Sequence, residues 1–98
     1  MSSTSEKEIA IAAMKIASQK ADGLAKFEEL YDEIPNLIQL TSDDLAPSQT
    51  RNGEPMWHQI VRNIQSHHQA EGNAINEGWL DHVPNTGYRI TTAGRRKI

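Results

Sequence analysis

Apolar residues recur every three to four positions in three stretches of the chain, the spacing of an amphipathic helix. The first stretch, about residues 5–20, begins with a capping box of Ser5 and Glu8 and is stopped by Asp22-Gly23. The second, about residues 24–33, is ended by Pro35-Asn36, because proline interrupts a helix. The third starts at Pro55, which a first helical turn tolerates, and its inward stripe is Trp57, Ile60, Val61 and Ile64.

Shorter elements are predicted between these helices. Residues 37–40 are too few and too apolar for a helix and predict a small buried strand. Thr41 and Asp44 form another capping pattern, but Pro47 closes that helix after little more than one turn. Residues 48–54, which contain Asn52-Gly53, predict a loop.

The end of the chain predicts a β-hairpin. Residues 79–83 and 88–92 form its strands, since Tyr88 and Ile90 alternate with polar residues, and residues 84–87 supply the turn. A helical turn at 74–77 with Gly78 as its C-cap precedes the hairpin, and residues 92–98 predict the first turn of a further helix.

The order of these elements predicts an α+β fold of the winged helix-turn-helix type. Such a fold has three to four helices and a small C-terminal β-hairpin wing, and 98 residues suffice for one such domain, residues 1–98. The chain begins at Met1 and stops as a basic helix begins. We therefore expect it to be the N-terminal part of a longer protein.

Composition predicts a cytoplasmic protein. Apolar residues make up 37% of the chain, and no apolar run approaches the roughly 18 residues of a membrane span. The chain has no cysteine, so neither disulfides nor a thiolate zinc site can support the fold. A membrane partner is not expected.

Charge is distributed unevenly along the chain. The net charge of -3 argues against a nucleic-acid partner when taken alone. Residues 1–50, however, carry four lysines against nine acids, a balance of -5, while residues 51–98 carry six basic residues against four acids, a balance of +2. The second half can therefore face a polyanion, although chance segregation in a short chain also produces such a pattern.

The third predicted helix has a polar outer face without acids. The major groove of DNA admits one α-helix, and carboxylates there are repelled by phosphates. Arg62 suits a guanine edge and Asn63 an adenine edge, each good pair contributing roughly 1–3 kcal/mol of discrimination. An ordinary solvated face also accounts for these residues. We predict double-stranded DNA binding through His58, Gln59, Arg62, Asn63, Gln65 and Ser66.

Further candidate DNA contacts flank this helix, because a hairpin tip can lie on the adjacent backbone or in the minor groove. Turn geometry alone also explains the residues of the loop and the hairpin tip, and a frayed terminus explains the basic end. The candidates are Arg51 and Asn52 in the loop, Asn85 and Thr86 at the tip, Arg89 on the last strand, and Arg95 and Arg96 at the end of the chain.

Three segments, Gly53–Ile64, Glu77–Leu80 and Gly87–Arg95, resemble the small winged-helix domains joined to restriction endonucleases, including the Mrr-type N-terminal domain. The most telling part reads G-Y-R-I-T-T-A-G-R, and the pattern covers about residues 37–95. The resemblance implies a DNA-reading accessory domain with a fused nuclease domain, and some relatives read methylated or otherwise modified bases. The chain departs from the pattern in a long loop at 47–54 and an insertion at 69–76.

Other chemistries have less support in the sequence. The acids lie on predicted helix exteriors or near caps, without the strand carboxylates and lysine of a metal-dependent nuclease. His67 and His68 point about 100° apart on a helix, so they form no metal pair. We predict no catalytic residue, metal, cofactor or small-molecule substrate. A winged helix that binds protein through its acidic first half, or a transcriptional regulator, is the open alternative.

Overall fold

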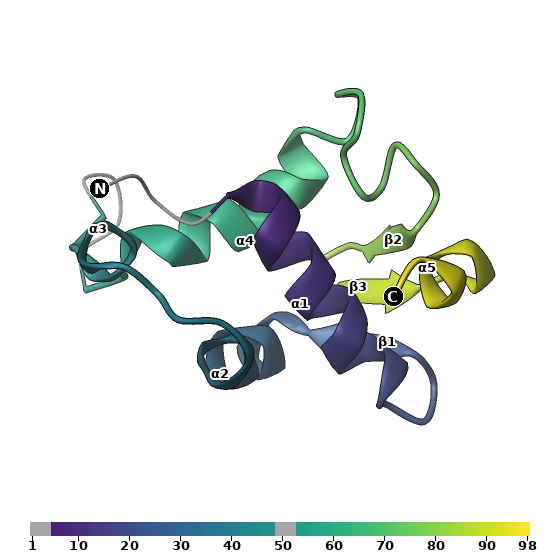
Figure 1. Cartoon of the computed structure of the whole chain (residues 1–98), viewed down its shortest axis with the longest axis horizontal. Helices are drawn as coiled ribbons and strands as arrows, with labels where there is room; N and C mark the ends of the chain where they lie inside the picture. Colours follow the sequence, from purple (N-terminus) through teal and green to yellow (C-terminus); the bar gives the residue numbers. More distant parts are fainter. Residues whose placement is uncertain (1–4, 49–52) are drawn as a thin grey trace.

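A computed structural model describes residues 5–48 and 53–98, and this part of the chain forms five helices and one three-stranded antiparallel sheet. The predicted α+β class is confirmed. Helix α1 crosses the middle of the molecule, and α3 and α5 lie at opposite ends of its long axis (Figure 1). The elements are α1 (Glu6–Ser18), β1 (Leu24–Lys26), α2 (Phe27–Leu37), α3 (Ser42–Leu45), α4 (Met56–Ser66), β2 (Leu80–Val83), β3 (Gly87–Ile90) and α5 (Thr92–Lys97).

Helix α1 is the centre of the core. Its capping box forms as predicted, with the Ser5 hydroxyl accepting from the Glu8 N–H at 3.2 Å and the Glu8 carboxylate accepting from the Ser5 N–H. The buried side is wider than the expected stripe, because α2, α4 and the sheet all pack against it. The side chains it buries are Ile9, Ala10, Ala12, Ala13, Met14, Ile16 and Ala17.

The sheet contains one strand besides the two of the hairpin, and this strand is β1. The prediction of a strand at residues 37–40 is wrong. β1 pairs with β3 over Leu24↔Arg89 to Lys26↔Gly87, so the sheet order is β1-β3-β2. Gly23 starts this pairing with a positive φ of 72°, and its carbonyl accepts from the Ile90 N–H at 2.9 Å. The turn at Asp22-Gly23 therefore leads into a strand, where the sequence predicted the start of a helix.

Helix α2 begins later and ends later than predicted. It starts at Phe27 and continues through Pro35 to Leu37. A proline inside a helix loses one hydrogen bond. The last turn persists because Ile34 is fully buried and its carbonyl accepts from the Ile38 N–H at 3.2 Å.

Helix α3 begins as predicted, and α4 begins at Met56, directly after the predicted start at Pro55. Thr41 and Asp44 form the expected capping box of α3, and Pro55 is the N-cap of α4. The predicted loop at 48–54 lies largely outside the described residues, but its ends meet, since Pro47 and Pro55 form an antiparallel bridge. The Ser48 N–H also donates to the Glu54 carbonyl at 2.7 Å, which fixes the backbone entering α4.

The predicted hairpin is confirmed, with strands slightly shorter than expected. The turn before it, residues 74–77, makes one helical hydrogen bond from the Glu77 N–H to the Asn73 carbonyl at 2.9 Å without becoming a helix. Gly78 follows with a positive φ of 80°, and Thr91 caps α5 by accepting from the Gly94 N–H at 2.9 Å.

Tyr88 joins the hairpin to α4. Its side chain is fully buried, and its hydroxyl donates to the Val61 carbonyl at 2.7 Å and accepts from the Gln65 N–H at 3.2 Å. The hairpin and α4 are therefore held in a fixed relation. Among the helices of residues 5–48 and 53–98, none is long and apolar enough to cross a membrane.

Candidate nucleic-acid interface

Helix α4 buries one side and keeps a polar side toward solvent. Trp57, Val61 and Ile64 are buried, as the apolar spacing predicted. The sequence of α4 contains no acidic residue, so its outer side carries hydrogen-bonding groups without negative charge. Those outer residues are Gln59 and Asn63, which are half-buried, and Ser66, which is exposed.

Arg62 has partners within the protein, which the sequence did not predict. Its guanidinium forms an ion pair with Glu54, the residue before Pro55, and Nη1 also donates to the Tyr31 hydroxyl at 3.4 Å. The side chains of Arg62 and Glu54 are only 23% and 20% exposed. Burial lowers the pKa of Arg62, but the bonds to Glu54 and Tyr31 outweigh it and leave the pKa raised.

His58 packs flat on α2. Its ring stacks on Tyr31 with centroids 4.0 Å apart and planes 14° apart, and Nδ1 lies 3.9 Å from the Glu54 carboxylate. Burial lowers the pKa of His58 below its ordinary value of 6.5; Glu54 opposes this shift and Arg62 adds to it. His58 is therefore neutral near pH 7.

The hairpin tip reaches the same region through Tyr31. A shallow cleft is lined by Lys26, Phe27, Glu28, Tyr31, Asn85 and Thr86. Asn85 is exposed with a φ of 60°, and the Thr86 carbonyl accepts from the Phe27 N–H at 2.8 Å. The hairpin tip shares this cleft with Tyr31, on which His58 of α4 stacks, so the structure brings the tip and the first turn of α4 to one tyrosine.

Tyr31 and Glu54 were not among the predicted site residues. Tyr31 lies within the second predicted helix, and its side chain is half-buried. Glu54 was assigned to a loop. A signal for Glu54 exists in the sequence, since Glu54, His58 and Arg62 are spaced by four and therefore line one side of a helix extended by one turn.

Two further predicted residues of α4 lie at its C-terminal end. The Gln65 side chain is half-buried and its amide donates to the Ser66 hydroxyl at 3.2 Å. The Ser66 hydroxyl donates to the Arg62 carbonyl at 3.4 Å, a bond to its own helix. Both side chains remain at the surface.

The remaining cationic candidates lie apart from this region. Arg89 is exposed on the outer side of the sheet, directly across the ladder from Asp81. Arg95 donates to the Ser18 carbonyl at 3.4 Å, and Arg96 is exposed beside it on α5. Helix α5 lies at the opposite end of the molecule from the start of α4 (Figure 1). Arg51 and Asn52 lie outside the described residues.

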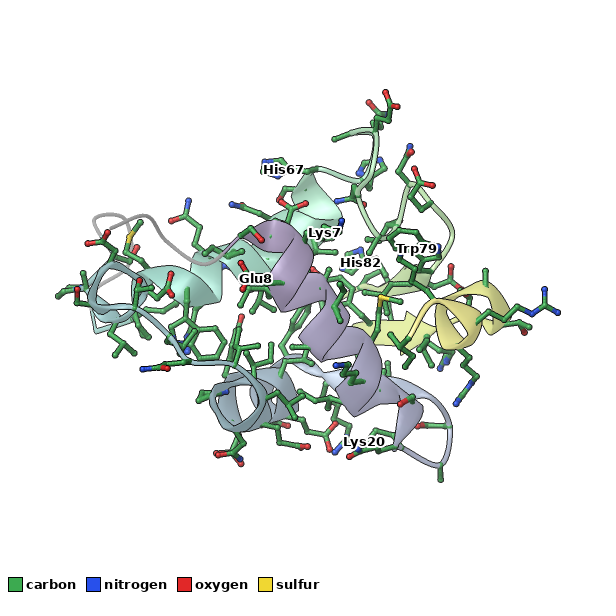
Figure 2. The ribbon with its side chains drawn as sticks, viewed as in Figure 1. Lys7, Glu8, Lys20, His67, Trp79 and His82 are labelled. Carbon is green, nitrogen blue, oxygen red and sulfur yellow. The ribbon has the colours of Figure 1, made fainter. Side chains whose placement is uncertain are left out.

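The segment after α4 is tied back to α1. His67 Nδ1 lies 2.7 Å from the Glu6 carboxylate, and the buried Asn73 amide donates to Glu6 at 3.2 Å and to the Ile64 carbonyl at 2.8 Å. Figure 2 shows His67 at the end of α4, above the first turns of α1. The predicted insertion at 69–76 is thus anchored on the α1 side of α4.

Acidic residues border the region on α2. Glu29 and Glu33 both pair with Lys20, at 3.6 and 2.9 Å. The hydrogen bond that Lys20 donates to Glu33 raises the pKa of Lys20, and the hydrogen bond from the Lys26 backbone N–H lowers the pKa of Glu29. Glu28 and Asp32 are exposed, which leaves negative charge next to the hairpin tip.

Comparison of the chain with protein-family models, with curated proteins and with solved structures gives no match.

Proposed function

We propose that the chain binds double-stranded DNA as a winged-helix domain, with α4 in the major groove and the β2–β3 tip on the neighbouring backbone. The observation that carries this proposal is the juxtaposition of an acid-free helix with a hairpin tip across Tyr31. The two elements are also fixed to each other by the hydroxyl of Tyr88.

The topology supports the winged-helix part of the proposal. A helix, a strand, two further helices, α4 and a hairpin follow one another, and β1 completes the sheet in the order β1-β3-β2. In this arrangement the last helix before the hairpin is the one that enters the groove.

The outer side of α4 supplies the groups that read bases. Gln59 and Asn63 carry amides that can pair with an adenine edge, and Ser66 can bond to either purine. These side chains suit contact with a groove better than the side chain of Arg62 does, because Arg62 is already paired with Glu54. At the tip, Asn85 and Thr86 face the backbone together with Lys26.

Affinity for duplex DNA at two salt concentrations tests the proposal. Phosphate contact predicts that log K falls by about 0.9 per log unit of salt for each phosphate neutralised. Gln59→Ala and Asn63→Ala should each weaken binding to a preferred sequence about tenfold. Gln19→Ala is the matched control, because this exposed glutamine is the C-cap of α1 and precedes Lys20, which lies away from α4 (Figure 2). Equal losses in all three variants would contradict the proposal.

A link to a nuclease rests on the resemblance of Gly87–Arg95 to the winged-helix domains of restriction endonucleases. We propose on that ground that the chain is the DNA-reading domain of such an enzyme, with Arg89, Arg95 and Arg96 on the duplex outside the α4 contact. Affinity for methylated and unmodified duplexes of one sequence tests whether a modified base is read.

A protein partner is the second candidate. The exposed carboxylates of Glu28 and Asp32 on α2 favour it, because they repel phosphates next to the hairpin tip. If the chain binds a protein and not DNA, no binding to duplex DNA should be detected at low salt. Reversing the charge at the hairpin tip with Glu28→Lys should then still give no detectable binding.

A further inference from the structure

We infer that Glu54 fills an anion site between α2 and α4 which a DNA phosphate takes over when the chain binds DNA, an inference that rests on the proposed function. Glu54 would then act as an internal substitute for phosphate. The inference rests on three observations: the contacts around the Glu54 carboxylate, the hydrogen bonds that fix its backbone, and its position near the two proposed DNA contacts.

Two side chains, Arg62 and His58, approach the Glu54 carboxylate, and Tyr31 contacts both of them. Arg62 pairs with its Oε1 through Nη1, and His58 Nδ1 lies 3.9 Å from the same oxygen. Tyr31 accepts from Arg62 at 3.4 Å and stacks on His58. The Trp57 ring packs edge-on against the rings of Tyr31 and His58, with centroids 6.0 and 4.5 Å away, and so supports both side chains. The Arg62 guanidinium is therefore the donor of the site, and aromatic rings surround it.

A phosphate can replace the carboxylate on the same donors. The guanidinium fork binds carboxylate and phosphate in the same bidentate manner, so Arg62 serves either anion. The Tyr31 hydroxyl accepts from Arg62 and keeps its own hydrogen for an anion. These properties distinguish the site from a solvated surface arginine.

Exchange of the two anions needs little rearrangement. The backbone of Glu54 is fixed by the bond from Ser48 N–H at 2.7 Å and by the bridge between Pro47 and Pro55. A rotation of the Glu54 side chain alone therefore frees Arg62. Tyr31 also lines the cleft at the hairpin tip, so the freed Arg62 lies next to a residue that borders this cleft, and a DNA backbone contacting both the tip and α4 would pass it.

The inference predicts that the Glu54 charge holds DNA affinity down. Glu54→Gln should bind duplex DNA roughly three- to tenfold more tightly and with a steeper salt dependence, because a competing ion pair is removed. In an Arg62→Ala background the same substitution should change affinity little. Glu28→Gln is the matched control: it removes the same charge from an exposed position and should act equally in both backgrounds.

Titration with inorganic phosphate, followed by NMR at the Arg62 side-chain Nε–H, separates this inference from the proposed function. The anion site is supported if phosphate shifts the Arg62 Nε–H signal in Glu54→Gln and shifts it much less in the unsubstituted protein. If that shift occurs and no variant binds DNA, the proposed function fails and the site stands. If DNA binds and Glu54→Gln gains no affinity, or gains equally without Arg62, the inference is overturned. If phosphate causes no shift and no variant binds DNA, both the inference and the proposed function are overturned.

Circular dichroism checks that each variant folds. Glu54→Asp serves as a second variant, because it keeps the charge but draws the carboxylate away from Arg62. It should give a smaller affinity gain than Glu54→Gln, and a loss of affinity would contradict the inference.

Discussion

The hydroxyl of Tyr88 is the residue on which the relation between hairpin and helix depends most. Burial raises the pKa of this hydroxyl, so it stays protonated and donates to the Val61 carbonyl, while it accepts from the Gln65 N–H. A buried side chain that satisfies two backbone groups costs more to remove than a surface hydrogen bond. Tyr88 was expected only as an inward residue of a strand, because alternation shows direction and not the partner across the core.

Tyr88→Phe should lower the free energy of unfolding by about 1–3 kcal/mol, because the two hydrogen bonds between the hairpin and α4 are lost. Urea unfolding measures this change. Tyr31→Phe is the matched control: its hydroxyl accepts one bond of 3.4 Å at a half-buried position, so the loss should stay within about 0.5 kcal/mol. Equal losses for the two variants would contradict the assigned role of Tyr88.

The lowered pKa of His58 predicts a pH dependence of stability. The unfolded chain takes up a proton at the ordinary pKa of 6.5, whereas folded His58 takes it up only at lower pH. The stabilising contribution is therefore present above pH 6.5 and is lost as pH falls through and below that value. Unfolding free energies between about pH 7.5 and 5.5 should fall less steeply in His58→Gln than in the exposed-site control His68→Gln. Identical slopes would count against a buried His58.

At the scale of elements, the helices with local signals could be predicted and the strand without one could not. Ser5 with Glu8 and Thr41 with Asp44 start helices through contacts three residues apart, so the sequence alone predicts them. β1 has only three residues, and its pairing with β3 joins positions more than sixty residues apart. Pairing at that distance leaves no periodic signal, and residues 24–26 were therefore predicted as helix.

Gly87 explains why β1 can approach β3. A Cβ at this position would collide with the Ala25 carbonyl oxygen and lie 2.8 Å from the Lys26 Cα. Gly87→Ala should therefore destabilise the fold by about 3 kcal/mol, in the range of overpacking. Gly53→Ala is the control, since its Cβ would meet nothing within 4 Å and only the positive φ of 76° opposes it, at about 1–2 kcal/mol. Thermal unfolding compares them, and an equal loss would contradict the tight β1–β3 contact.

At the scale of the whole molecule, the uneven distribution of charge along the chain could be read from the sequence, but the positions of the charged residues in the fold could not. The acidic first half and the basic second half do not form two separate faces, because α2 with Glu28 and Asp32 lies next to the hairpin tip. The predicted basic residues are divided too: Arg62 lies beside Tyr31, and Arg95 and Arg96 lie on α5 at the far end (Figure 1). Side-chain pairing such as Glu54 with Arg62 depends on the tertiary fold and had to come from the structure.

The central claim is that the outer side of α4 and the hairpin tip together contact duplex DNA. Backbone amide chemical shifts, recorded while a duplex is titrated into the protein, test it most directly because they locate the contact without any substitution. The perturbed amides should gather at residues 58–66 and at Asn85 and Thr86, while those at the end of α1 near Gln19 should stay unchanged. Perturbations confined to α5 or to the acidic side of α2, or no saturable perturbation at low salt, would contradict it.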